Sequence, residues 1–281
     1  MNLLELELKA NDIRKKLLRV IHEGGTGHTG GSLSSADVLT ALYYRVLHVD
    51  PSKTDDPDRD RFILSKGHCV EGYYSILADR GFISQEELHT FSRYQTRLIG
   101  HPNNEIPGVE VKTGALGHGL PVGVGMAIGL RKNASPARVF VLMGDGEQEE
   151  GSVWEAAMSG AHYKLDNLTG IVDRNHLQIS GTTEDVIGLE PFADRWRAFG
   201  WAVREIDGND MEQIVAAFDA LPFENEKPSL IVAHTIKGKG VKEMENIAKW
   251  HHGVPDDTLL QSALSQLDEH EADLRKKGAV L

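Results

Sequence analysis

The chain has 281 residues, 40% of them hydrophobic, so it can bury a sizeable core without disulfides. Its single cysteine, Cys69, excludes an internal disulfide framework. Thirty basic and 42 acidic residues give a net charge of −12, which disfavours nucleic acid as a partner. No apolar run approaches the roughly 20 residues of a membrane span, and the acidic start lacks the basic cluster of a secretory leader. We therefore expect a cytoplasmic protein without membrane contact.

The first predicted elements are helices. Apolar residues between Leu3 and Ile21 recur at helical spacing until the breaker Glu23-Gly24-Gly25. After a glycine-rich loop, Ser34-Ser35-Ala36-Asp37 has the spacing of a capping box, which predicts a second helix ending at Leu47. Ser84-Gln85-Glu86-Glu87 repeats this start signal.

Short runs of branched aliphatic residues then alternate with helical segments. The predicted strands are Arg61–Leu64, Arg138–Met143, Leu168–Val172, Trp201–Ile206 and Ser229–Ala233, and the predicted helices are Gly151–Tyr163, Pro191–Phe199 and Met211–Leu221. This alternation predicts an α/β fold, a doubly wound, mostly parallel sheet with helices on both faces. We expect one domain over residues 1–281, with a helical N-terminal segment over about residues 1–60. An acidic helix after Pro255 is expected to pack at the sheet edge or to lead to a partner.

Two oxygen-bearing side chains follow neighbouring strands. Asp145 comes directly after a strand, between Gly144 and Gly146, and Asn175 follows the next strand 30 residues later. Ligands of such sheets bind beyond the carboxyl ends of the strands, and Mg²⁺ prefers oxygen donors. Gly-Asp-Gly alone is commonly a simple turn, but the second donor favours a metal site. The rival phosphate loop Lys237-Gly238-Lys239-Gly240 lacks the Ser or Thr of a Walker motif.

Several motifs in the same order resemble the N-terminal region of transketolases, which use thiamine diphosphate. They are Gly27-His28 with Ser34-Ser35-Ala36-Asp37, Ser65-Lys66-Gly67-His68, Gly100-His101-Pro102, Thr113-Gly114-Ala115-Leu116-Gly117, Gly144-Asp145-Gly146-Glu147, Glu150-Gly151, Trp154-Glu155-Ala156 and Trp250-His251. Gly-Asp-Gly followed about 30 residues later by Asn is the thiamine-diphosphate fingerprint. The resemblance implies the thiamine-diphosphate-binding fold.

The resemblance also implies roles for individual residues. The implied Mg²⁺ ligands, which could also take Ca²⁺ or Mn²⁺, are Asp145, the side chain of Asn175 and the main-chain carbonyl of Leu177. Residues matching contacts to thiamine diphosphate are His68, Gly114, Leu116, Gly146, Asn175 and Lys237. Histidines matching those around the thiazolium carbon and the sugar oxygens are His28, His101 and His251. Acids matching those that link two active sites across a dimer are Glu150 and Glu155.

The sequence departs from the family at two histidines. His118 stands where many relatives have Gln, and His252 where Gly often follows Trp-His. The second departure leaves open whether His251 or His252 enters the site; we favour His251 because it directly follows Trp250. A histidine chosen at random from the 13 would most often be an ordinary hydrogen-bonded surface residue, but His28, His68 and His101 each adjoin a glycine, which favours a functional role. Cys69 is expected to be a buried, inert thiol.

The implied function is that of the N-terminal subunit of a split transketolase, which transfers a two-carbon ketol unit from a ketose phosphate to an aldose. A separately encoded C-terminal subunit would complete the site in an α₂β₂ assembly. Two alternatives stay open. One is the thiamine-binding subunit of a 2-oxo-acid decarboxylase or dehydrogenase, and the other is a non-catalytic scaffold subunit.

Overall fold

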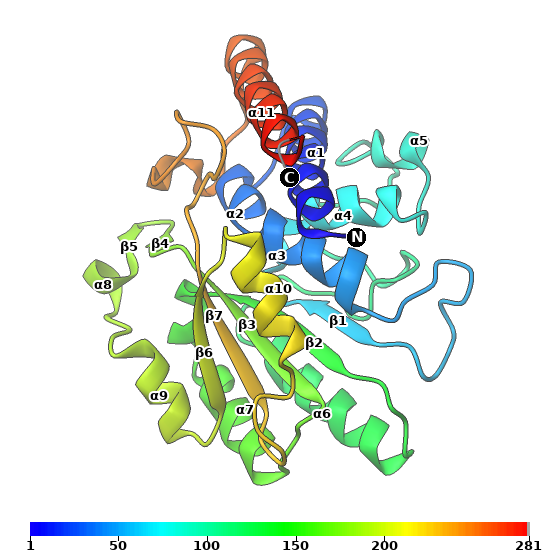
Figure 1. The fold of residues 1–281 in the computed structure, drawn as a ribbon, viewed down its shortest axis with the longest axis vertical. Helices are drawn as coiled ribbons and strands as arrows, with labels where there is room; N and C mark the ends of the chain where they lie inside the picture. The colour runs from blue at the N-terminus through cyan, green and yellow to red at the C-terminus, as the bar shows by residue number, and fades with distance from the viewer. Residues whose placement is uncertain (280–281) are drawn as a thin grey trace.

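Five parallel strands form the central sheet of the computed structural model, which describes residues 1–279 (Figure 1). Their order across the sheet is β1-β2-β3-β7-β6, and every neighbouring pair is parallel. The bounds are β1 Arg61–Leu64, β2 Val139–Gly144, β3 Leu168–Arg174, β6 Ala202–Asp207 and β7 Ser229–His234, with a separate two-stranded hairpin of β4 Leu177–Gln178 and β5 Gly181–Thr182. All five predicted strands are therefore present, within one or two residues of the predicted bounds.

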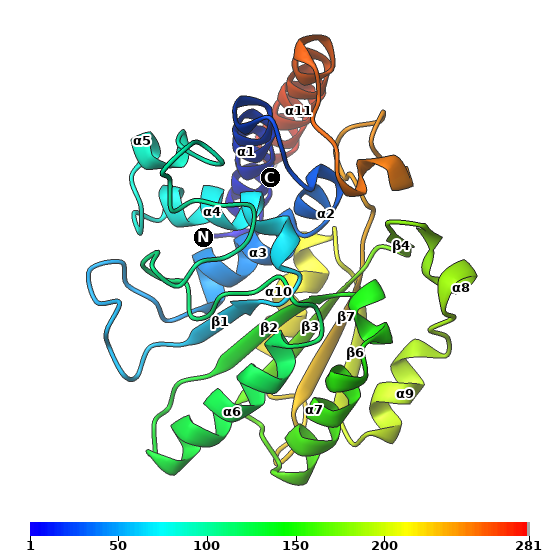
Figure 2. The same cartoon turned by 180° about the vertical axis from the view of Figure 1, so that it is seen from behind.

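Helices cover both faces of this sheet, which confirms the doubly wound prediction. One face carries α10 together with the N-terminal helices, and α6, α7 and α9 lie on the opposite face, which Figure 2 turns towards the viewer. The helices are α1 Leu3–Gly24, α2 Thr29–Ser34, α3 Ala36–Ala41, η1 Leu42–Val46, η2 Gly67–Cys69, α4 Val70–Asp79, α5 Gln85–Leu88, α6 Gly119–Lys132, η3 Gly146–Glu149, α7 Gly151–His162, α8 Thr183–Val186, α9 Phe192–Ala198, α10 Met211–Asp219, η4 Ala248–His251 and α11 Asp257–Gly278.

Strand β2 shows why the buried strands read as continuous apolar runs. Phe140 and Leu142 pack into the hydrophobic cluster on the α10 side of the sheet. Val139, Val141 and Met143 pack into the cluster on the α6 and α7 side. Because successive side chains point to opposite faces, a strand covered by helices on both faces needs apolar residues at every position.

The capping box predicted from Ser34-Ser35-Ala36-Asp37 does not form, although α3 does begin at Ala36 with Ser35 as its N-cap residue. The segment before it is also helical, because α2 already begins at Thr29. The hydroxyls of Ser34 and Ser35 instead donate to the carbonyl oxygen of Gly31, over 3.0 and 2.8 Å, inside the helical turn. The corresponding prediction at α5 is confirmed, because the Ser84 hydroxyl accepts the backbone N–H of Glu87 over 3.0 Å.

The acidic helix after Pro255 packs along α1 rather than at the sheet edge (Figure 1). Asn11 Nδ2 donates to the carbonyl oxygen of Leu267 over 2.8 Å, and Lys15 Nζ lies 2.7 Å from Glu271. Helices α1 and α11 lie on the side of the sheet that carries the other N-terminal helices. Among residues 1–279, no helix is apolar over a stretch long enough to cross a bilayer.

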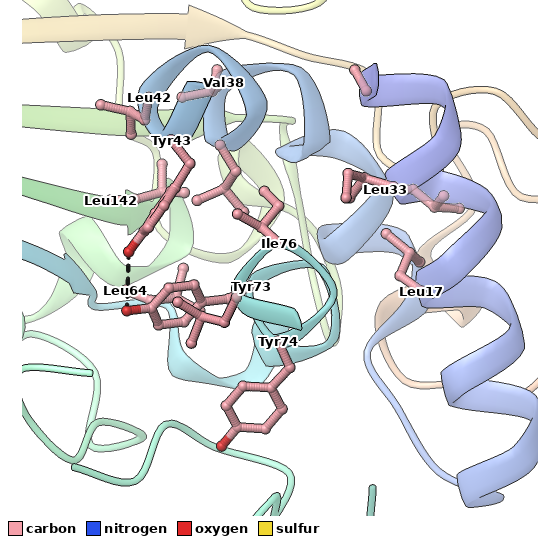
Figure 3. Packing of buried hydrophobic residues seen from close by; sticks show 14 of the residues in the cluster. Leu17, Leu33, Val38, Leu42, Tyr43, Leu64, Tyr73, Tyr74, Ile76 and Leu142 are labelled. Atoms are coloured by element: carbon pink, nitrogen blue, oxygen red, sulfur yellow. Dashed lines mark hydrogen bonds between the residues drawn. The ribbon is translucent and has the colours of Figure 1, made fainter. Parts of the chain in front are cut away.

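Helix α4 is anchored deep in the larger hydrophobic cluster. Tyr73 and Ile76 on α4 pack with Tyr43 and Leu64, and the hydroxyls of Tyr43 and Tyr73 lie 3.2 Å apart (Figure 3). On the other side of the same cluster, Leu17 of α1 is fully buried. The packing of Tyr73 and Ile76 therefore fixes the position of α4, including its first turn, relative to the neighbouring loops.

Candidate functional site

A pocket of about 360 Å³ opens beyond the carboxyl ends of β2 and β3. The register of the two strands pairs Gly144 with Asp173, so the residues that follow them leave the sheet at the same level. Every predicted site residue except Glu155 lines this pocket: His28, His68, His101, Gly114, Leu116, Asp145, Gly146, Glu150, Asn175, Leu177, Lys237 and His251. The fold thus brings together residues that are up to 223 positions apart, from His28 to His251.

The three predicted metal ligands lie on two loops that are bonded to each other. Asp145 Oδ2 accepts the backbone N–H of His176 over 2.6 Å, and Oδ1 accepts that of Gly146 over 2.8 Å. Asn175 Oδ1 accepts the N–H of Leu177 over 3.1 Å. No three His, Cys, Asp or Glu side chains of residues 1–279 are grouped to hold a metal by themselves. A cation here would have to use amide and carbonyl oxygens as well as the carboxylate.

Asp145 is almost fully buried, and this burial raises the pKa of its carboxyl, as does the nearby Asp173 carboxylate. Arg174, fully buried behind it, acts in the opposite direction, with Nη1 at 3.4 Å from Asp145 Oδ2. Arg174 also donates to Thr183 and Glu190, over 2.7 and 2.9 Å, and so ties the segment after β5 to the loop that carries Asp145.

Four imidazole rings form one wall of the pocket. The centroid of His28 lies 5.0 Å from that of His68, 6.3 Å from His101 and 5.6 Å from His251. Burial lowers the pKa of His28 to about 4, helped by the neighbouring His252 and His101, and lowers that of His251 to about 3, helped by Lys237. These imidazoles are therefore neutral near pH 7, and each offers one N–H donor and one nitrogen acceptor.

The two histidines after Trp250 occupy different places. His251 lines the pocket, and its Nδ1 lies 3.3 Å from Lys237 Nζ. His252 is exposed and lies outside the pocket lining; its ring packs 4.8 Å from that of His28, and its Nε2 lies 3.2 Å from the Thr26 hydroxyl. The geometry favours His251 as the ring that faces a ligand.

Two glycines mark close approaches in the pocket wall. Gly114 has a φ of +137°, and a Cβ there would lie 2.8 Å from His101. At Gly146 a Cβ would lie 2.9 Å from Gln178 Oε1. By contrast, a Cβ at Gly125 of α6 would meet open space. Side chains at Gly114 or Gly146 would therefore disturb the pocket.

Of the two acids expected to connect neighbouring active sites, only Glu150 lines the pocket. Glu150 stands at the N-cap position of α7, where its side chain makes no capping hydrogen bond. Glu155 lies further along α7, exposed and away from the pocket. Their role across a dimer stays a prediction.

Sequence reasoning missed a buried ion pair at the pocket, in which Lys66 belongs to the lining. Lys66 and Asp173 are each about 1% exposed and pair directly; Lys66 Nζ also donates to the carbonyl oxygen of Gly31 over 3.0 Å. Burial acts to lower the pKa of Lys66, but the Asp173 carboxylate raises it above its usual value. The signal was present, because Lys66 belongs to a motif quoted for its histidine and Asp173 stands two residues before Asn175.

A second missed residue is Glu147, which follows the Gly-Asp-Gly motif. Its buried carboxylate accepts the backbone N–H groups of Gly117 and Gly144, over 2.9 and 3.0 Å, and the hydroxyl of Ser65. It therefore joins three segments of the pocket wall.

Comparison with known proteins agrees with this geometry. Residues 7–264 match the family model described as "Transketolase, thiamine diphosphate binding domain". The chain is 51% identical, over 97% of both chains, to one of the subunits of apulose-4-phosphate transketolase from Phocaeicola vulgatus. It is 40% identical, over 96% of this chain and 98% of the relative, to a 6-deoxy-6-sulfo-D-fructose transketolase subunit of Clostridium sp..

Solved structures of full-length relatives share the fold. Transketolase from Pichia stipitis superposes with a TM-score of 0.86 at 27% identity, over 96% of this chain and 44% of that one. Transketolase from Campylobacter jejuni gives 0.84 at 28% identity, over 99% and 49%. The chain thus spans just under half the length of these solved proteins. It belongs to the transketolase family, as a thiamine-diphosphate-binding domain of that family.

Proposed function

We propose that this chain is the cofactor-binding subunit of a split transketolase. It binds thiamine diphosphate through Mg²⁺ and, with a separately encoded C-terminal subunit, transfers a two-carbon ketol unit from a ketose phosphate to an aldose. The observation that carries the proposal is the shared pocket of Asp145 and Asn175 with the wall of neutral histidines. We place the protein in the cytoplasm.

The donor atoms suit Mg²⁺ together with a diphosphate. A carboxylate oxygen of Asp145, the amide oxygen of Asn175 and the carbonyl oxygen of Leu177 are all hard donors, and Mg²⁺ commonly completes its shell with substrate phosphates. Lys237 Nζ lies 2.9 Å from the carbonyl oxygen of Leu177, so the buried ammonium group of Lys237 stands beside the proposed metal ligands. Thiamine diphosphate, when bound, supplies the carbanion and the electron sink of ketol transfer.

The side chains of this subunit would bind, orient and move protons. Neutral His28, His101 and His251 can hydrogen-bond sugar hydroxyls and pass protons to and from them. Half-buried His68 and the glycine at position 114 would shape the pocket around the cofactor. A wall of imidazoles suits polyhydroxylated substrates, which need many donors and acceptors.

The relatives support a two-chain enzyme. Two relatives that this chain matches over nearly their full length are named as transketolase subunits, whereas the solved single-chain transketolases are about twice as long. We propose that the partner supplies the remaining part of the active site in an α₂β₂ assembly. Mass photometry of the co-expressed subunits tests this stoichiometry, and a stable 1:1 heterodimer would contradict it.

The donor sugar follows by analogy with the relatives. Two of them, at 51% and 45% identity, are named as subunits of apulose-4-phosphate transketolase. We therefore propose apulose 4-phosphate as the first donor to assay with the complex, beside xylulose 5-phosphate, 6-deoxy-6-sulfofructose and pyruvate. Ketol transfer from a ketose phosphate is the expected result. Turnover of pyruvate alone would support the 2-oxo-acid alternative, which the named relatives do not favour.

The cofactor site is tested by Asp145→Ala in the reconstituted complex. The variant should lose Mg²⁺-dependent binding of thiamine diphosphate in calorimetry, because it lacks the only carboxylate among the three proposed ligands. Asp194→Ala, which removes an exposed carboxylate on α9, serves as the matched control and should bind like the wild type. Equal affinity in Asp145→Ala and wild type would overturn the proposed site.

A further inference from the structure

A buried carboxylate that does not line the pocket lies directly beneath one of its histidines. Glu71, in the first turn of α4, is fully buried and belongs to none of the roles described above. Its Oε1 accepts the backbone N–H of His28 over 3.0 Å, and its Oε2 accepts the hydroxyl of Ser32 over 2.6 Å. Neither donor is charged. Burial of a carboxylate against neutral donors carries a desolvation cost, which the hydrogen bonds to these two donors offset only in part.

Both donors belong to the beginning of α2. His28 is the N-cap of this six-residue helix, and no side chain of the helix itself caps it. In a capping box, a Glu at the third helical position accepts the N–H of the N-cap residue. Here that position is Gly31, where a Cβ would collide with Cys69 Sγ, so the helix cannot provide the acid itself. Glu71 supplies the same hydrogen bond from a different helix.

The loop before α2 is packed closely against the same carboxylate. A Cβ on Gly27 would lie 2.8 Å from Glu71 Oε1 and 2.6 Å from Ile21 Cγ1. From the other side, the N–H of Gly253 donates to the carbonyl oxygen of Gly27 over 3.1 Å. The backbone of His28 is therefore held between a carboxylate on one side and the 250–253 segment on the other.

We propose that Glu71 is a positioning residue for His28: it fixes the backbone at the start of α2 and thereby holds the His28 imidazole against His68 and His251 in the pocket. This inference rests on the proposed function, since His28 is assigned there to the substrate. Glu71 itself touches neither substrate nor cofactor. Its removal lets the N-cap residue shift, and a displacement of about 1 Å at a reacting group can lower a rate by as much as 100-fold.

The test compares Glu71→Ala with Glu71→Gln and with Ile76→Ala, a truncation in the buried core of the same helix. Gln can accept the His28 N–H and donate to the Ser32 hydroxyl, so it should restore most of what Ala loses. In the complex, Glu71→Ala should lower kcat about 10-fold or more while the Kd for thiamine diphosphate stays within twofold. Ile76→Ala should lower stability but leave kcat near the wild-type value.

Two further measurements separate positioning from general damage. In a His28→Ala background, Glu71→Ala should cause no additional loss of kcat, because residues acting through one another are not additive. In ¹⁵N-histidine spectra of the isolated full-length chain, the His28 ring signals should move in Glu71→Ala but neither in Glu71→Gln nor in Ile76→Ala. An additive loss, or unchanged His28 signals, would overturn the inference. Failure of the wild-type complex to bind thiamine diphosphate would overturn the proposed function instead, and the spectra would still decide the role of Glu71.

Discussion

Lys237 Nζ donates to the carbonyl oxygen of Leu177 over 2.9 Å, inside the pocket. Burial lowers the pKa of this ammonium, so its bond to a carbonyl at a proposed metal-ligand position is made at a desolvation cost. We predict that Lys237→Met weakens thiamine diphosphate binding about 10- to 100-fold, since a hydrogen bond to a charged group contributes about 1.5–3 kcal/mol. Calorimetry on the complex measures this. Lys239→Met, two residues along the same loop and outside the pocket lining, should leave Kd unchanged.

The two adjacent histidines after Trp250 should differ in their effect on turnover. His251→Ala is expected to lower kcat about 100-fold, the range typical of a lost proton-transfer group. His252→Ala should change kcat by only a few fold, because its ring lies behind His28 and outside the pocket lining. Steady-state assays of both variants with one ketose phosphate check this. A larger loss in His252→Ala would reverse the assignment.

The buried Lys66–Asp173 pair should be costly to break from one side. Lys66→Met leaves Asp173 without its cation at about 1% exposure, and we expect a loss of about 3–5 kcal/mol in the free energy of unfolding. Urea denaturation of the isolated chain measures this. The double variant Lys66→Met/Asp173→Asn removes both charges and should recover part of the loss. If the single variant were as stable as the wild type, the pair would not matter for the fold.

Glu71 should make stability depend on pH. Burial raises its pKa from 4.5 to about 7, so between these values the folded state binds a proton that the unfolded state has released. Stability from this group is therefore full below about pH 4.5 and falls as pH rises towards 7, by an amount on the order of 3 kcal/mol. Glu71→Gln removes this titration. Its melting temperature relative to the wild type should rise between pH 5 and pH 8, and a constant difference would contradict the expectation.

Strand periodicity and the Asp145–Asn175 spacing predicted the architecture and the centre of the pocket. They succeeded because both are local: a strand covered on both faces must be apolar throughout, and parallel strands deliver their following residues to one edge of the sheet. The motif resemblance placed the histidine wall as well. The pairing of β1 with β2, which are separated by more than 70 residues, could not be read from either pattern.

What the sequence did not reveal depends on tertiary contacts. Ser34 and Asp37 had the spacing of a capping box, yet the Ser34 hydroxyl donates backwards to the carbonyl oxygen of Gly31 because α2 already runs through that region. The charges of Lys66 and Asp173 read as ordinary polar residues until the fold buries them against each other. Glu71 lies within an apolar helix, and its hydrogen-bond partners, His28 and Ser32, stand 43 and 39 positions earlier in the chain.

Hydrogen bonds between the 250–253 segment and residues 27–29 bring together two distant parts of the histidine wall, His28 and His251. The N–H of Gly253 bonds to Gly27, and the Thr29 hydroxyl donates to the Gly253 carbonyl over 2.5 Å, joining chain positions that are 224 apart. Each of these bonds closes a long loop, and the entropy cost of closure grows with the length of chain between the bonded residues. A chain that ended before Trp250 would lack both the His251 imidazole and the two bonds that hold the start of α2 against Gly253.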